Sequence, residues 1–244
     1  RPGQRKQRLD LSYIPEACAP AVQAGVDWLL QQPLEEVRIT SYDGLVLSAD
    51  FLAAETPRPK GVLLMFHGWR SNRYTDFGCV YRLFHDRGYH LLSVCQRAQG
   101  ESQGAVMTFG EKESRDCQSW AKYAALRFPE LDIFLHGISM GGATVLMASG
   151  LEMPQRVRAV VADCGFTSAW DQISYLMKAR HLPTRPFLDL EDLFCRAVGG
   201  FGLRRTPAPE ALSRTRLPVL FIHGLADTFV PPEMSRTNYA ACNS

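Results

Sequence analysis

The chain has 244 residues, of which 46% are hydrophobic and 21% charged, and its formal net charge is +2. A chain of this length and composition can bury the core of one large globular domain, which excludes disorder as its main state. The weak, evenly spread charge and the lack of RNA-binding or zinc-finger motifs argue against a nucleic-acid partner.

Residues 1–34 are predicted to form an N-terminal helical arm. Apolar and small residues recur there with helical spacing before Pro33, namely Ala21, Val22, Gly25, Val26, Leu29 and Leu30. We interpret the preceding basic run, RPGQRKQR, as a solvated tail. The alternative is a segment that follows a membrane anchor, because the sequence begins with Arg1 while no internal stretch is apolar and long enough to span a bilayer.

Residues 35–244 are predicted to form one α/β domain. The stretches VRIT and LVLSADFL flank the turn SYDG and predict an antiparallel edge hairpin. Continuous apolar runs then predict strands covered on both faces, at 61–66, 89–94, 131–135, 157–162 and 217–222. Helical patterns lie between them, at 79–88, 111–128 and 140–149, and this alternation predicts a doubly wound, mainly parallel sheet.

The alternation of strands and helices is interrupted at residues 164–216. This stretch is rich in aromatic and aliphatic residues, contains Pro183 and Pro186, and is too long for a simple crossover. We interpret it as a small, mostly helical cap inserted over the carboxyl ends of the strands, where open α/β sheets place their ligands.

Ser139 is the candidate nucleophile. It is the centre of Gly137-Ile138-Ser139-Met140-Gly141, with an apolar strand before it and a helical pattern after it, as a strand-to-helix nucleophile elbow requires. The alternative is a glycine-rich helix start in which Ser139 is only an N-cap. The backbone amide of Met140 would be one oxyanion donor, and the amide of Trp69, after the strand that ends at His67-Gly68, the second.

Asp227 is the candidate acid of the triad, because it lies in a turn after the last predicted strand. The alternative is an aspartate that only stabilises this turn. Asp163, at the end of the preceding strand, is a rival acid that we interpret as structural. We interpret His67 as a ring that stabilises its turn by hydrogen bonds, and not as the catalytic base.

Together these motifs resemble the α/β-hydrolase superfamily of serine esterases, lipases and prolyl-oligopeptidase-like enzymes, and within it a broad set of bacterial hydrolases. The resemblance covers nearly everything from residue 35 onward. It rests on His67–Asn72 (HGWRSN), Phe109–Glu113 (FGEKE), Gly137–Ala148 (GISMGGATVLMA), Ala162–Ser168 (ADCGFTS) and Pro218–Pro231 (PVLFIHGLADTFVP). The resemblance implies the chain order serine, aspartate, histidine for the catalytic triad.

The sequence departs from the family pattern in two places. In the stretch CQRAQGES, Cys95 stands where relatives often have an aspartate, and Ala98 or Gln99 occupies a usually glycine-rich turn. More importantly, none of the residues after Asp227 is a histidine, and of the six histidines in the chain only His181 lies on a loop that could bring it toward the site. We therefore expect a chain cut before its last strand and helix, with the catalytic histidine beyond residue 244; the alternative is a pseudoenzyme.

The expected function is hydrolysis of carboxylic esters, with a small ester or acyl compound as substrate and no metal or cofactor. Peptidase, amidase or thioesterase activity on the same fold is the alternative, and a non-catalytic binding module is another. A fragment without its histidine is expected to be nearly inactive. The seven cysteines form no C-x-x-C pair and no zinc-site pattern, so we expect free thiols and a cytoplasmic location.

Overall fold

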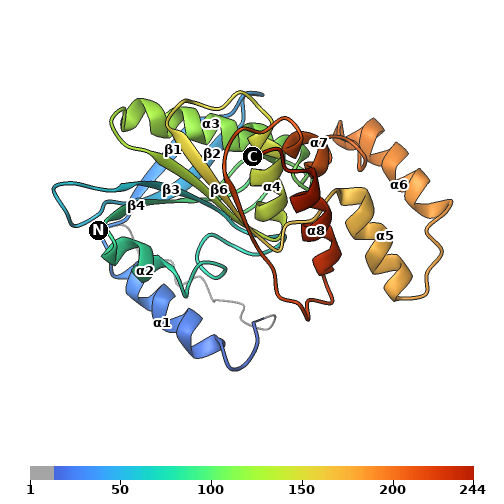
Figure 1. Cartoon of the computed structure of the whole chain (residues 1–244), viewed down its shortest axis with the longest axis horizontal. Helices are drawn as coiled ribbons and strands as arrows, with labels where there is room; N and C mark the ends of the chain where they lie inside the picture. Colours follow the sequence, from blue (N-terminus) through green and yellow to red (C-terminus); the bar gives the residue numbers. More distant parts are fainter. Residues whose placement is uncertain (1–13) are drawn as a thin grey trace.

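Seven strands form a single sheet in the computed structural model, which describes residues 14–244 (Figure 1). The basic run at residues 1–8 lies outside the described residues. The strands are β1 (Glu35–Thr40), β2 (Val46–Leu52), β3 (Gly61–Phe66), β4 (Tyr89–Val94), β5 (Ile133–Ile138), β6 (Val157–Asp163) and β7 (Val219–Ile222).

The sheet has the order β1-β2-β4-β3-β5-β6-β7 and is mainly parallel. The hairpin β1-β2 is antiparallel and also pairs antiparallel with β4, whereas β3, β4, β5, β6 and β7 pair in parallel. Parallel strands place their carboxyl ends at one edge, so β3, β5, β6 and β7 all end on the same side. The predicted α/β-hydrolase architecture is confirmed by this topology.

Helices cover both faces of the sheet (Figure 1). They are α1 (Ala19–Leu30), α2 (Tyr81–Asp86), α3 (Glu111–Arg127), α4 (Met140–Ser149), α5 (Ala169–Ala179), α6 (Phe187–Phe194), α7 (Ala208–Leu212) and α8 (Pro232–Ala241), with a π-helical turn at Cys195–Gly199. Among residues 14–244 no helix is long and apolar enough to cross a membrane.

The alternation of side chains along β3 divides the core into two layers. Leu63 and Met65 pack in the cluster that α1 and α2 cover. Leu64 and Phe66 face the opposite way, into the larger cluster that contains Trp120 of α3 and much of α4. The continuous apolar runs of the sequence therefore reflect strands buried on both faces, as predicted.

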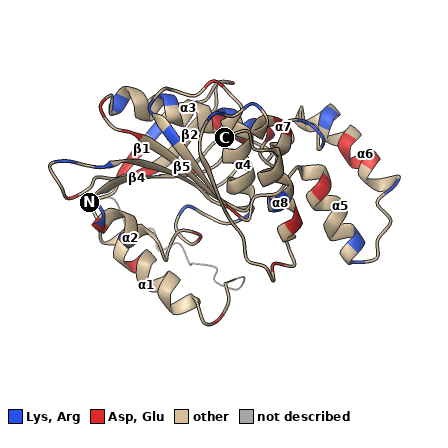
Figure 2. Ribbon diagram, in the orientation of Figure 1, with Lys and Arg blue, Asp and Glu red and all other residues tan. Residues whose placement is uncertain are grey.

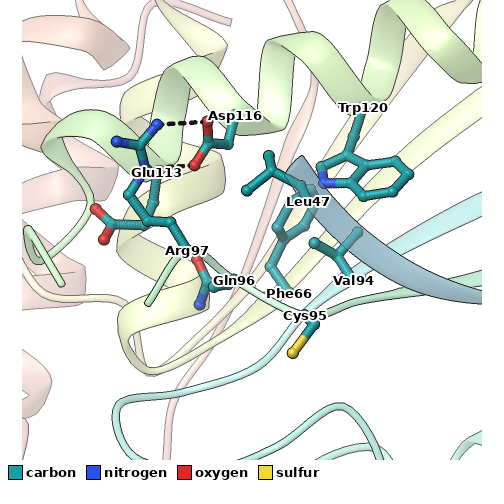
Figure 3. A pocket seen from close by; sticks show the side chains of 9 residues that line it. All are labelled: Leu47, Phe66, Val94, Cys95, Gln96, Arg97, Glu113, Asp116 and Trp120. Atoms are coloured by element: carbon teal, nitrogen blue, oxygen red, sulfur yellow. Dashed lines mark hydrogen bonds and ion pairs between the residues drawn. The ribbon is translucent and has the colours of Figure 1, made fainter. Parts of the chain in front are cut away.

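The loop after β4, where the sequence departs from the family pattern, is held by a buried arginine. Arg97 is 2% exposed, and its Nε lies 2.5 Å from Asp116 Oδ2 while its Nη1 lies 2.9 Å from Asp43 Oδ2. Figure 3 shows Arg97 beside Asp116 in a pocket that also has Leu47 and Trp120 in its wall. This pocket leaves no room for a water molecule, so it belongs to the packed interior and is not a ligand site.

Strand β7 is the edge strand on the other side of the sheet, and one of its faces is uncovered. Phe221 packs toward the large core cluster and against Tyr239 of α8. Leu220 and Ile222 alternate to the opposite face, where they are 57% and 43% exposed. Within residues 14–244, no strand pairs with the outer edge of β7, and these two side chains remain in contact with solvent.

Candidate active site

Ser139 occupies a strained turn between β5 and α4. Its φ of 54° and ψ of −115° lie in a region that residues with side chains rarely adopt. The amide of Ser139 donates to the carbonyl of Asp163 at 2.8 Å, and its own carbonyl accepts from the amide of Ala143 at 2.9 Å. These bonds fix the backbone, so the side chain stands at the carboxyl end of the sheet, as expected of a nucleophile elbow.

The two glycines of the motif are required by close backbone contacts. A Cβ atom at Gly137 would lie 2.0 Å from the carbonyl oxygen of Gly141, and one at Gly141 would lie 1.8 Å from the carbonyl oxygen of Phe66. Both distances are far inside van der Waals contact, and both neighbours are backbone. The sharp approach of α4 to β3 and β5 therefore exists only because these positions lack side chains.

The predicted oxyanion donors lie on two segments that meet at Ser139. Met140 is the first residue of α4, so its amide has no acceptor within the helix. Gly68 follows β3 and lies against the serine, because a Cβ on Gly68 would be 3.3 Å from the Cβ of Ser139. Trp69 comes next and is partly exposed. The arrangement can supply one amide from each segment to a developing oxyanion.

Asp76 holds the loop that carries Trp69. The amide of Gly68 donates to Asp76 Oδ2 at 2.6 Å, and the hydroxyl of Ser71 donates to Asp76 Oδ1. Nothing in the local sequence pattern distinguishes Asp76 from a surface aspartate. Its role follows only from the folding of the loop back onto itself.

His67 braces the same loop from inside the core. Its Nδ1 pairs with the carbonyl of Gly68 at 2.9 Å, and its Nε2 accepts from the amide of Gln96 at 3.3 Å. Burial lowers the pKa of this imidazole. Both ring nitrogens are therefore used in the neutral ring, and His67 has no free nitrogen to offer Ser139.

Asp227 lies in the turn after β7, as predicted, and its two carboxylate oxygens have different environments. Oδ1 accepts the amides of Phe229 and Val230 at 2.8 and 2.9 Å, which is the turn-stabilising geometry of an aspartate. Oδ2 lies 3.6 Å from Nε2 of His223. Oδ1 of Asp227 thus stabilises the turn, whereas Oδ2 accepts no amide of the turn and lies on the side of His223.

Asp163 and Cys164 lie between the serine and Asp227. Burial raises the pKa of Asp163, and the nearby charge of Asp227 raises it further. Cys164 lies beside the backbone amide of Ser139, and burial, reinforced by Asp163, raises the pKa of its thiol to about 12. The thiol therefore stays protonated at neutral pH and does not compete with Ser139 as a nucleophile.

The histidine that a triad needs is not found beside Ser139 in the described part of the chain. The ring of His223 is occupied by Ser235 Oγ at 2.6 Å and by the carbonyl of Val230 at 2.8 Å. His85, His90 and His136 are buried within the fold, and His181 is exposed in the loop after α5. In residues 14–244 the hydroxyl of Ser139 has no hydrogen bond to an imidazole, and no group of three or more potential metal ligands occurs there.

The structure thus brings together the elbow of Ser139, the amide of Met140 and the loop of Trp69. It places Asp227 at the end of β7, two strands away from β5 in the sheet. Two further contacts that hold this region, between Asp76 and Gly68 and between His67 and Gln96, are visible only in the tertiary structure.

Comparison with known proteins gives a family match and several distant relatives. The model of the serine aminopeptidase family S33 matches residues 57–192, more than half of the chain. The protein YqkD of Bacillus subtilis is 27% identical over 179 residues, which cover 72% of this chain and 58% of that protein. The lysophosphatidylserine lipase ABHD12 of Danio rerio is 24% identical over 183 residues, which cover 73% of this chain and 46% of the lipase.

Among solved structures, the esterase Pf2001 of Pyrococcus furiosus superposes with a TM-score of 0.67 at 23% identity. The superposition covers 86% of this chain and 78% of the esterase, and at this identity it shows a shared fold. The chain spans 58% and 46% of the two curated relatives described above, so it corresponds to part of each.

Proposed function

The chain belongs to the serine aminopeptidase family S33 of α/β-hydrolases, and from that membership we propose that it is the catalytic region of a serine hydrolase that cleaves carboxylic esters. The observation that carries the proposal is the strained backbone of Ser139 at a glycine-enclosed turn between β5 and α4. Strain of this kind persists where function requires it, and here it exposes one hydroxyl at the ligand-binding edge of the sheet.

In the proposed reaction the Ser139 oxygen attacks the carbonyl carbon of the ester and its proton passes to a histidine. The amides of Trp69 and Met140 stabilise the oxyanion that forms on the carbonyl oxygen. The histidine then gives the proton to the leaving alcohol, and an acyl group remains on Ser139. Water, deprotonated by the same histidine, releases the acid and restores the serine.

We place the histidine beyond residue 244, on a loop after a strand that pairs with the outer edge of β7. Leu220 and Ile222 support this placement, because a further strand and helix would remove these two apolar side chains and the unpaired strand edge from water. A histidine on that side would lie next to Asp227, and its ring would point from there toward Ser139. Asp227 could therefore orient the imidazole as the acid of a triad does. Oδ2 of Asp227 is the oxygen available for this, because Oδ1 holds the turn.

An ester with an acyl chain or aromatic group is the proposed substrate. Support comes from the apolar side chains in the turn after β7, where Leu225 and Phe229 are both exposed. Apolar surface of this kind favours an apolar substrate group over a charged one. As part of the same proposal we place the activity in the cytoplasm, because the seven cysteines are all unpaired thiols.

Aminopeptidase activity is the second candidate, favoured by the name of the matched family. The same Ser139 chemistry would then act on an amide and release an amine. Parallel assays of p-nitrophenyl acyl esters and of aminoacyl p-nitroanilides separate the two candidates. We expect a kcat/KM for the esters that is at least about 100-fold higher.

The nucleophile itself is tested by labelling the full-length gene product with a fluorophosphonate probe. We expect covalent labelling of Ser139, loss of labelling in Ser139→Ala, and unchanged labelling in Ser149→Ala, a buried serine on the same helix. Residues 1–244 alone should label far more slowly than the full-length protein, because no imidazole activates the serine. A folded full-length protein that does not label would identify the chain as a non-catalytic module.

A further inference from the structure

The turn that carries Asp227 is held through the backbone of Phe229 and Val230. Asp227 Oδ1 accepts the amides of these two residues. Their carbonyl groups accept from two other side chains. Nε2 of His223 donates to the carbonyl of Val230 at 2.8 Å, and Nε2 of Gln172 donates to the carbonyl of Phe229 at 2.6 Å. His223 directly follows β7, whereas Gln172 lies on α5, 57 residues before Phe229 in the chain.

One peptide unit connects Gln172 to Asp227. The carbonyl group of Phe229 and the amide of Val230 belong to the same planar unit. Gln172 binds the oxygen of this unit at 2.6 Å, and Asp227 Oδ1 accepts its N–H at 2.9 Å. A planar unit moves as a whole, and hydrogen bonds on its two sides strengthen each other by polarisation. The place of the Gln172 amide therefore determines where the N–H that holds Asp227 lies.

The first turn of α5 is a rigid support for Gln172. Ser168 caps the helix by accepting the amide of Asp171. The hydroxyls of Ser168 and Thr167 both donate to Asp171 Oδ2 at 2.7 Å. Gln172 follows directly and is 6% exposed, so its side chain leaves a turn whose backbone is already fixed. A side chain on such an element can hold a neighbouring loop in one place.

Packing alone does not account for an amide at position 172. Within the described residues, Oε1 of Gln172 is buried and has no hydrogen-bond partner. A buried carbonyl oxygen without a donor destabilises the fold, and a methionine of similar size would fill the same space without this cost. The bond from Nε2 to the carbonyl of Phe229 is therefore what a glutamine supplies here.

We propose that Gln172 is a positioning residue, which holds Asp227 where its Oδ2 can orient the catalytic histidine. It acts through the peptide unit between Phe229 and Val230 and does not touch the substrate. The proposal rests on the function proposed above, because it takes Asp227 as the acid of the triad. Small displacements of a catalytic group lower rates strongly, so a residue that fixes the acid contributes to the reaction.

No cation of the turn can replace this support. Residues 223–231 contain one acidic residue, Asp227, and neither lysine nor arginine (Figure 2). The titratable neighbours of Asp227 are His223, whose Nε2 lies 3.6 Å from Oδ2, and Asp163. Nε2 of His223 already donates to the carbonyl of Val230, and an ionised Asp163 repels a second carboxylate. The position of Asp227 therefore depends on the backbone of its turn.

The test compares ester hydrolysis by the full-length wild type, Gln172→Met and Gln118→Met. Gln118 is the matched control, because its Nε2 donates to the carbonyl of Glu152 at 2.7 Å from α3, at the opposite edge of Figure 1 from the turn before α8. In Gln172→Met we expect kcat/KM to fall about tenfold or more, mainly through kcat, because a displaced acid orients the histidine poorly. Gln118→Met should match the wild type.

The pH profile separates positioning from a merely structural role. The acid limb of kcat/KM should move to lower pH in Gln172→Met, because the imidazolium of the triad loses part of its negative partner. Partial unfolding would lower the rate and leave this limb in place. If Gln172→Met does not unfold cooperatively, Gln172→Leu takes its place.

Amide hydrogen exchange of Phe229 and Val230 measures the same support without catalysis. Exchange should be about tenfold faster in Gln172→Met than in the wild type, and unchanged in Gln118→Met. With an active wild type, an unchanged acid limb or unchanged exchange in the folded variant overturns the positioning role while the proposed function stands. A folded full-length wild type that hydrolyses no ester overturns the proposed function, and the role of Gln172 with it.

Discussion

His136 should make the stability of this protein depend on pH between neutrality and mild acid. It lies on β5, three residues before Ser139, and its ring packs edge-on against Phe77 and Phe84 at centroid distances of 5.1 and 6.1 Å. Its Nδ1 is buried without a hydrogen-bond partner. Burial disfavours the charged imidazolium and lowers the pKa of His136 to about 4.

The direction of this pH dependence follows from the protons that His136 binds in the folded and in the unfolded state. In the unfolded chain the imidazole has a pKa near ~6.5, so between there and pH ~4 the unfolded state binds a proton that the folded state does not. The stability that His136 contributes is therefore complete above pH ~6.5 and is lost as the pH falls toward ~4. For these two pKa values, going from about pH 7 to about pH 5 lowers the free energy of unfolding by about 2 kcal/mol.

Urea unfolding at these two pH values measures this loss in the wild type and in His136→Phe, which keeps an aromatic ring between Phe77 and Phe84. The wild type should lose about 2 kcal/mol more than the variant on acidification. His181→Phe, which changes an exposed histidine, should behave like the wild type. If His136→Phe lacks a cooperative transition, His136→Leu takes its place. An equal loss in the wild type and in a folded variant would show that His136 is not the source of the pH dependence.

Three further substitutions test how the site is built. Gly141→Ala should cost more than ~3 kcal/mol in urea unfolding, because its Cβ would meet the Phe66 carbonyl at 1.8 Å, whereas Gly224→Ala, with open space around it, should cost less than ~1 kcal/mol. Arg97→Met should destabilise the fold by ~3–5 kcal/mol, because Asp116 would stay buried without its partner. Arg38→Met, at an exposed arginine, should change the stability little. Equal effects of the two substitutions would contradict a structural role for Arg97. Asp76→Asn should slow fluorophosphonate labelling of Ser139 in the full-length protein about tenfold or more at unchanged melting temperature, since the loop of Trp69 loses a charged acceptor. Asp86→Asn on α2 should label at the wild-type rate.

The candidate site was predictable where the chemistry depends on residues close together in the sequence. The elbow is an example, because the strand, the serine, the flanking glycines and the helix all lie within residues 133–149. The same holds for the loop of Trp69 and the turn of Asp227, each of which directly follows an apolar strand. Their presence at one edge of the sheet followed from the parallel pairing that the alternation of strands and helices predicts.

Other features of the site depend on contacts between distant parts of the chain. Gly141 is needed because its backbone meets the carbonyl of Phe66, and Gln96 is needed because its amide meets the ring of His67. Asp76 acts through a loop whose folding no local pattern describes. Side-chain periodicity cannot reveal such contacts, because it reports which face of an element is buried and not which atoms meet it.

The α/β architecture and the glycine-flanked turn at Ser139 could thus be predicted from the sequence alone, because hydrophobic periodicity and glycine placement are local properties of the chain. Three features follow from the folded structure and from no local pattern: the ring nitrogens of His67 and His223 are occupied, Leu220 and Ile222 are uncovered on β7, and α6 turns an apolar face outward. These are results of packing. The burial and hydrogen bonding of a side chain are set by neighbours that the fold brings together from distant positions.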